Sequence, residues 1–269
     1  MSTPAIQLKD NAPSEKYLAV SFRFLLGLYL LIPACLGLQL FDQYFFDFSI
    51  RDALPSSPGH FILFQLLFGT PHIIASSLLL LAHPDYLKVF RKRLVFMTVF
   101  IAVFFGVGSL FIPYTALYVM TACWTVYHVL KQQHGIAKAV CRLPVYAFNL
   151  QVGLSVIGGC FIYLGVFLKN SLSEEQATQI LDVAMYLCIA LTVSSLWCLR
   201  FINHAQGFWF LWANTVLVLI SYYFLSQHYY FLAILIPRLV HDVSAFSFYV
   251  SHDVNRHQSA ADTHPIYAC

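Results

Sequence analysis

The chain has 269 residues, of which 59% are hydrophobic and 10% are charged, and its formal net charge is +3. Soluble globular domains contain roughly 25% charged residues, so this composition excludes that class and indicates a membrane protein. There is no strongly basic surface that would bind nucleic acid. We therefore expect membrane lipids and small molecules as partners, and no nucleic acid.

Eight apolar stretches are each close to the roughly 20 residues that cross a bilayer as a helix. They are residues 17–40, 61–82, 94–112, 114–130, 144–168, 180–200, 207–225 and 228–250. We predict an all-α fold, a polytopic transmembrane helical bundle of about eight spans in a single domain over residues 17–258. Because the break at Pro113 is tight, seven spans are the alternative. The polar segments 1–16 and 259–269 are predicted to be cytoplasmic tails, the first of them disordered.

The basic residues are distributed unevenly between the two sides of such a bundle. With eight spans, every Lys and Arg lies on the side of the two termini except Arg51 and Lys169, on the opposite side, and Arg238, within a span. Cytoplasmic loops carry the excess of Lys and Arg. The bias therefore predicts a protein of the bacterial inner membrane with both termini cytoplasmic.

Two features mark the loops of the opposite side. In Ser-Leu-Ser-Glu-Glu-Gln, the spacing of Ser171 and Glu174 predicts a capping box that opens the next helix. His228 lies at the membrane interface among residues typical of an aromatic belt. These are Tyr222, Tyr223, Tyr229 and Tyr230.

Three histidines lie deep inside apolar stretches, where a titratable side chain is costly and by default marks a functional site. They are His72, His128 and His241, each in a span that runs in the same direction. At about 1.5 Å per residue their depths agree to roughly one helical turn. We predict that the three imidazoles bind one metal ion. Hydrogen bonding between helices is the alternative for each of them.

Two prolines and an ion pair accompany these histidines. Pro71 directly precedes His72, and Pro237 lies one turn before His241, so both helices are predicted to kink at the site. Arg238 and Asp242 are four residues apart and are expected to pair. We predict catalytic roles for both, with Asp242 as an outer partner or a weak ligand, whereas a purely structural pair is the alternative.

Further histidines are predicted at the cytoplasmic rim. His134 and His252 are candidate fourth ligands if their helices end early, and with His257 they could form a separate rim site. His252 follows His241 by eleven residues, or about 16 Å, so the two cannot bind the same ion. Solvated polar surface is the other interpretation of this group.

The chemistry of the predicted site follows from its donors. No glutamate lies in any predicted span, which argues against a carboxylate-bridged di-iron centre. Neutral imidazoles suit iron, copper or zinc. Iron with open coordination positions can activate dioxygen, whereas zinc activates water. We expect Fe(II), with zinc as an alternative.

The stretch Gly69-Thr70-Pro71-His72, in a polytopic chain with histidines in its spans, resembles the Brp/Blh β-carotene dioxygenases. The resemblance covers this short motif and the architecture. It implies that His72 is an iron ligand and that the reaction cleaves a long apolar polyene with dioxygen. The chain departs from the family at residues 73–76, Ile-Ile-Ala-Ser, where the family has a small residue and an aspartate after the histidine.

The sequence thus predicts an iron-dependent oxygenase whose lipid-soluble, carotenoid-like substrate enters from the bilayer. One alternative is a haem b electron-transfer protein with two of the histidines as axial ligands. Another is a metal-free transporter or proton relay through His128, Lys131, His241 and Asp242. A structural role of the bundle is also open.

Overall fold

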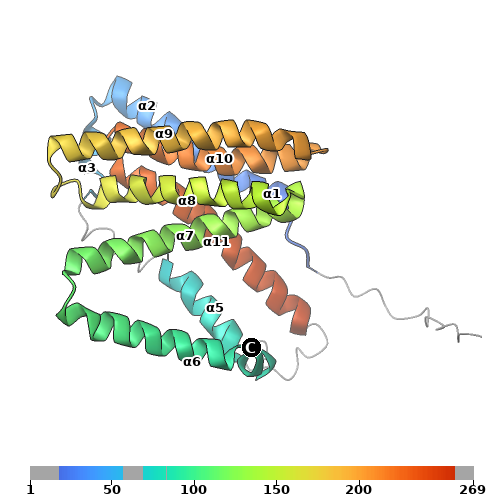
Figure 1. The fold of residues 1–269 in the computed structure, drawn as a ribbon. Coiled ribbons are helices and arrows are strands. Elements are labelled where there is room, and N and C mark those ends of the chain that lie inside the picture. Colours follow the sequence, from blue (N-terminus) through green and yellow to red (C-terminus); the bar gives the residue numbers. More distant parts are fainter. Residues whose placement is uncertain (1–17, 57–68, 83, 258–269) are drawn as a thin grey trace, which may run out of the picture.

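The computed structural model describes residues 18–56, 69–82 and 84–257, and the regular structure in these ranges is entirely helical (Figure 1). The predicted all-α bundle is therefore confirmed. The predicted tails, residues 1–16 and 259–269, lie outside the described residues.

The first apolar stretch folds as three consecutive helical pieces. They are α1 (Phe22–Gly27), the 3-10 turn η1 (Leu28–Leu30) and α2 (Leu31–Phe45). Together they give a continuous apolar segment long enough to cross a membrane. The chain then turns through Asp47 and Phe48, both with positive φ, into the short helix α3 (Ser49–Ala53).

Two helices lie to one side of the main bundle. They are α5 (Thr70–Ala82) and α6 (Pro84–Gly106), the latter followed by the 3-10 turn η3 (Gly108–Leu110). α5 packs against α11, whereas α6 packs mainly against α5 (Figure 1). Side chains such as Phe96 and Val99 leave the outer surface of α6 apolar and exposed, as expected for a helix that faces lipid.

Five helices form the main bundle. They are α7 (Tyr114–Cys141), α8 (Val145–Phe167), α9 (Glu174–Cys198, continued by the 3-10 turn η4, Leu199–Phe201), α10 (Ala205–Ser226) and α11 (Tyr230–His257). α10 and α11 are the most buried of the candidate spans. Their residues Phe224, Ala233, Ile236 and Val240 have no exposed surface. Short connections place the loops alternately at the two ends of the bundle (Figure 1).

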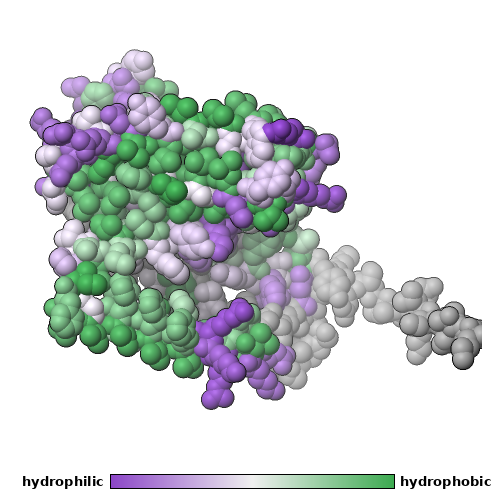
Figure 2. Space-filling model, viewed as in Figure 1, coloured by the Kyte–Doolittle hydropathy of each residue, from purple (hydrophilic) through white to green (hydrophobic). Residues whose placement is uncertain are grey.

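The surface agrees with a membrane location. In Figure 2 a broad hydrophobic band covers the helices, and hydrophilic residues gather toward the ends of the bundle. Six helical segments within the described ranges are long and apolar enough to cross a membrane. The protein is therefore an integral membrane protein by the length and composition of its helices.

The structure has about six candidate spans within the described residues, so the predicted number of eight is corrected. The six segments are 22–45, 87–110, 145–167, 174–201, 205–226 and 230–255. The predicted span 114–130 is part of α7, which continues as one helix of 28 residues to Cys141. α7 is not among the six candidate spans. Of the predicted span 61–82, residues 61–68 lie outside the described part of the chain, and α5 accounts for 13 residues, about 20 Å of helix.

The predicted capping box is displaced by two residues. α9 begins at Glu174, so its N-cap is Ser173 and not Ser171. The Gln176 backbone N–H donates to Ser173 Oγ at 3.2 Å, and the Ser173 backbone N–H donates to Gln176 Oε1 at 3.0 Å. Both patterns satisfy the rule that Glu or Gln lies three residues after the capping hydroxyl, and sequence spacing alone does not choose between them.

Polar side chains join the central helices within the apolar interior. Gln151 on α8 donates to Ser194 Oγ at 3.0 Å and to Ser195 Oγ at 3.2 Å on α9. The Ser195 hydroxyl lies 2.7 Å from that of Thr215 on α10. Such hydrogen bonds hold membrane helices together because lipid offers no competing partner. They fix the frame on which the histidines of α7 and α11 are placed.

Candidate functional site: a histidine pair on α7 and α11

His128 on α7 and His241 on α11 come into direct contact. Their ring centres are 5.0 Å apart and the ring planes make an angle of 78°. His241 has no exposed surface, whereas His128 lies at an exposed position of α7. The structure thus brings together two of the three histidines that the sequence places at one depth, and one of the two can be reached from outside the bundle.

The predicted ion pair lies beside this contact. Arg238 Nε donates to Asp242 Oδ2 at 3.0 Å, and the two residues are only 5% and 6% exposed. The other carboxylate oxygen, Asp242 Oδ1, is 3.8 Å from His241 Nε2, slightly beyond hydrogen-bond distance. The partners neutralise one another, which reduces the cost of burying each charge. The carboxylate therefore faces the buried imidazole without adding net charge.

Tyr163 on α8 is a residue of this region that the sequence reasoning missed. It is 7% exposed and lies beside Pro237 on α11, the residue that precedes Arg238. Nothing in the sequence marks it, because it is one of 16 tyrosines and it lies in an otherwise apolar span. Only the packing of α8 against α11 reveals it.

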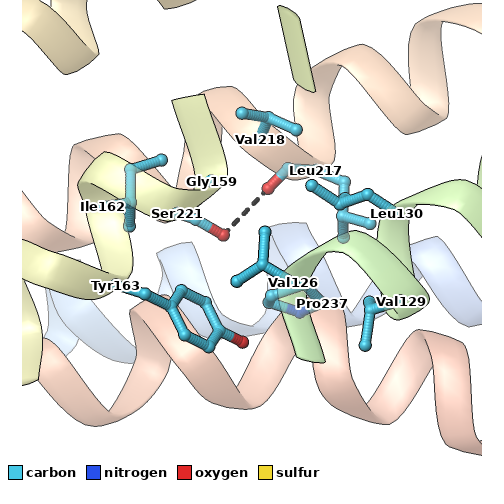
Figure 3. Close-up of a pocket in the computed structure, with 10 residues that line it drawn as sticks. All are labelled: Val126, Val129, Leu130, Gly159, Ile162, Tyr163, Leu217, Val218, Ser221 and Pro237. Atoms are coloured by element: carbon cyan, nitrogen blue, oxygen red, sulfur yellow. Dashed lines mark hydrogen bonds between the residues drawn. The ribbon is translucent and has the colours of Figure 1, made fainter. Parts of the chain in front are cut away.

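A small cavity lies beside Pro237, between α7, α8, α10 and α11 (Figure 3). Tyr163 directs its hydroxyl toward Pro237, and the Ser221 hydroxyl donates to the Leu217 carbonyl at 3.0 Å. The cavity volume is about 20 Å³, enough for about one water molecule. A lipid-soluble substrate cannot fit there, so the accessible approach to the histidine pair is on the side of His128.

His134 does not join the pair, and its predicted place in a solvated rim is wrong. It is 3% exposed, and its Nε2 lies 2.8 Å from Ser155 Oγ on α8. Six residues separate it from His128, so it projects from a different face of α7. His134 therefore forms a polar contact between α7 and α8. The sequence suggested such interhelical hydrogen bonding as an alternative for His72, His128 and His241, and not for His134.

The remaining predicted ligands lie on α5 and at the end of α11. His72 belongs to α5, the helix that packs against α11, but its side chain lies outside the described residues. His72 as a third ligand therefore stays a prediction. His252 is exposed near the end of α11, three turns beyond His241. It is separate from the pair, as its spacing along the helix predicts.

The predicted metal site can be compared with the separation of the two rings. Two imidazoles that bind one ion at a near-tetrahedral angle through bonds of about 2.1 Å have ring centres about 5 Å apart, and the observed separation is 5.0 Å. Among the side chains that the structure describes, no group of three or more His, Cys, Asp or Glu residues is placed to hold an ion. The predicted three-histidine site would therefore need a ligand beyond the described pair.

Comparison with family models, with curated proteins and with solved structures found no match. The resemblance to the Brp/Blh dioxygenases therefore rests on residues 69–72 and on the architecture. The function has to be argued from the geometry of the site.

Proposed function

We propose that the protein is a membrane-embedded metal enzyme in which His128 and His241 bind one Fe(II) ion. We propose further that it oxygenates a lipid-soluble, carotenoid-like substrate. The observation that carries the proposal is the direct approach of two imidazoles from separate helices, with ring centres 5.0 Å apart. Histidines inside a bilayer are costly, and binding of a shared metal ion would explain why they are there.

The neighbouring side chains suit this role. A histidine that binds a metal usually presents its second ring nitrogen to a carboxylate or carbonyl, which fixes the orientation of the ring. Asp242 Oδ1, 3.8 Å from His241 Nε2, is placed to be that partner. Arg238 holds the carboxylate through the hydrogen bond to its other oxygen. His72 on α5 is the proposed third ligand.

Bound iron with open coordination positions would supply the activation of dioxygen. The chain itself would bind and orient the substrate on the exposed side of His128, while the buried side at His241 excludes bulk water. An apolar substrate would reach this side from the surrounding membrane lipids. Cleavage of one carbon–carbon double bond by one dioxygen molecule gives two carbonyl groups, so this reaction consumes no separate reductant.

A haem with His128 and His241 as its two axial ligands fits the pair poorly. To hold a haem, His128 and His241 would need the iron and the porphyrin between their rings, at a greater separation. The two rings here are closer, 5.0 Å apart, and meet edge to face. The separation therefore favours a single ion over a haem as the group that the two histidines would hold.

A metal-free proton relay is the second candidate, and a different observation favours it. A series of neighbouring charged or titratable groups leads from the interior to an exposed position: Arg238, Asp242, His241 and His128. Lys131, which the sequence suggested as a further member, instead donates to the Tyr127 hydroxyl on its own helix.

For the location of the protein we propose the bacterial inner membrane, with both termini cytoplasmic. Arg23 lies in α1, Arg142 is the C-cap of α7 and Arg200 lies in η4, and these elements meet at the end of the bundle where α10 begins (Figure 1). Arg51 and Lys169 line one pocket with residues of α3 and the start of α11. The bias of basic residues toward the cytoplasm supports this orientation.

Dioxygen uptake separates the candidate functions. The protein is purified in detergent, loaded anaerobically with Fe(II) and mixed with β-carotene in micelles, and dioxygen consumption and cleavage products are measured. The oxygenase proposal predicts uptake that His241→Ala reduces at least about a hundredfold, since removal of a ligand disables the site. His204→Ala changes an exposed histidine at the N-cap of α10 and serves as the matched control, with uptake expected to stay as in the wild type.

Proteoliposomes provide the opposing test. Proton flux driven by a pH gradient, unaffected by a chelator and abolished in His241→Ala, would replace the oxygenase proposal by the relay. Dioxygen uptake that is equal in the wild type and in His241→Ala would contradict the assignment of the site to this pair.

A further inference from the structure

A polar pocket, distinct from the cavity beside Pro237, lies at the end of the bundle opposite the N-terminus of α1 and the C-terminus of α11. It is formed where α3, the connection between α8 and α9 and the turn between α10 and α11 meet, and its volume is about 430 Å³. Its lining residues are Arg51, Asp52, Ser56, Lys169, His228 and Tyr230. Tyr230 is eleven residues before His241, or about 16 Å along α11. The pocket is therefore separate from the histidine pair.

The pocket contains the two basic residues that the sequence places on the side of the membrane opposite the termini. Arg51 and Lys169 are far apart in sequence, yet both line this pocket. Arg51 Nε pairs with Asp52 Oδ1 at 2.9 Å, which leaves the two Nη groups of its guanidinium for a ligand. Lys169 Nζ lies 4.2 Å from the centre of the Tyr230 ring, and no ion pair of Lys169 with a carboxylate occurs among the described residues. The lining therefore carries an excess of positive charge.

Tyr230 organises the basic side chains around it. Its hydroxyl lies 2.9 Å from His228 Nδ1, and its ring carries the Lys169 ammonium on one face. When the hydroxyl donates to Nδ1, the imidazole proton resides on Nε2, which becomes a hydrogen-bond donor. His228 adopts a left-handed backbone conformation with φ 63°, which is uncommon for a residue other than glycine. Burial lowers the pKa of Lys169, because desolvation disfavours the charged ammonium group.

A buried carboxylate holds the walls of the pocket in place. Asp42, at the end of α2, has no exposed surface. It accepts hydrogen bonds from the backbone N–H groups of Ile50 and Arg51, both at 2.8 Å, and from the Tyr229 hydroxyl at 2.7 Å. Arg51 and the residues on either side of Tyr229 are thereby fixed relative to one another. Such a supporting layer is typical of preorganised binding sites.

We propose that this pocket binds an anionic phosphate or carboxylate group through Arg51, Lys169 and His228. Charge-assisted hydrogen bonds from guanidinium and ammonium groups are the strong contacts to such anions. Because the pocket lies where membrane spans end, the group belongs either to the headgroup of an anionic phospholipid or to a soluble ion. The proposal is independent of the reaction at the histidine pair.

The test compares two sources of phosphate on the full-length protein. In one arm, inorganic phosphate is titrated against the protein in a neutral detergent and the thermal midpoint is recorded. In the other arm, native mass spectrometry counts the phosphatidylglycerol and phosphatidylcholine molecules retained from mixed micelles. The variants are Lys169→Gln and Arg51→Gln. Lys138→Gln is the matched control, because Lys138 Nζ also lies over an aromatic ring, 4.6 Å from Phe148, at the opposite end.

We expect the wild type and Lys138→Gln to bind alike, and Lys169→Gln and Arg51→Gln to bind about tenfold more weakly or worse. Lys169→Arg, which keeps the charge, should restore most of the binding and so separates loss of the site from loss of the fold. Retention of phosphatidylglycerol alone assigns the pocket to a lipid headgroup, and stabilisation by inorganic phosphate assigns it to a soluble anion. If neither ligand distinguishes the wild type from both site variants, the proposal is wrong.

Discussion

Substitution of Gly159 by alanine tests the close packing that positions α7 and its histidine. A Cβ atom at Gly159 of α8 would lie 2.7 Å from Val126 Cγ1 and 3.0 Å from Leu130 Cδ1, both on α7. Carbon atoms in contact are normally about 3.5–4.0 Å apart. The Val126 side chain, or the part of α7 that carries it, must therefore shift by about 0.8 Å or more, and Val126 lies only two residues before His128.

The expected cost follows from overpacking. Extra methyl groups in a well-packed interior destabilise by about 1–3 kcal/mol, and the better helix propensity of alanine offsets about 1 kcal/mol. Gly153 provides a control in the same helix, because a Cβ atom there meets nothing within 4 Å. Gly153→Ala should be neutral or slightly stabilising. We expect Gly159→Ala to be less stable than Gly153→Ala by about 1–3 kcal/mol.

The assay is reversible unfolding in mixed micelles, followed by circular dichroism, with the metal affinity of each variant measured in parallel. Gly159→Ala should lose stability and also bind metal more weakly, since it displaces the part of α7 that carries His128. Equal stability of the two alanine variants would refute the packing argument.

Three further predictions concern buried charged and polar side chains. Asp42→Asn replaces an acceptor oxygen by a donor that faces N–H or O–H groups, and it should lower the free energy of unfolding by about 3 kcal/mol. Asp47→Asn, at an exposed position, should leave that free energy unchanged in the same denaturation experiment. Arg238→Ala leaves Asp242 buried without its guanidinium and should cost about 3–5 kcal/mol, and a double-mutant cycle should show the Arg238→Ala/Asp242→Ala variant to be more stable than Arg238→Ala. Burial and the hydrogen bond to Asp42 raise the pKa of Tyr229. The stability that its protonated hydroxyl gives the folded state is therefore fully present below the unfolded pKa of about 10. This stability is lost as the pH rises through the folded pKa. Tyr229→Phe should be less stable at neutral pH and should show a smaller alkaline loss of stability, and an unchanged alkaline profile would contradict this assignment.

The helices of the main bundle were predictable because long apolar runs give clear limits. The predicted spans 144–168 and 207–225 correspond to α8 (Val145–Phe167) and α10 (Ala205–Ser226). The continuation of α7 to Cys141 was not predicted. Its polar stretch from Lys131 to His134 suggests a helix end, whereas His134 is buried against Ser155. That partner is 21 residues away, and sequence periodicity does not reveal such a contact.

The sequence predicts the depth of a residue in the membrane well, but it does not predict the rotation of its helix about the axis. The rise per residue is nearly constant in a helix, so the similar depths of His128 and His241 follow from counting. Their rotation depends on how α7 and α11 pack, and only the structure shows that the two rings meet. The same limit applies to Arg51 and Lys169, which the sequence places on one side but cannot place in one pocket.

The central claim is that His128 and His241 hold one metal ion, and the metal content of the purified protein tests it most directly. The protein is loaded with Fe(II) under anaerobic conditions, freed of excess metal, and assayed for iron per chain by mass spectrometry in the wild type, His128→Ala, His241→Ala and His204→Ala. We predict about one iron per chain in the wild type and in His204→Ala, with loss of most of it in each of the other two variants. Equal iron content in all four proteins, or none in the folded wild type, would contradict the claim.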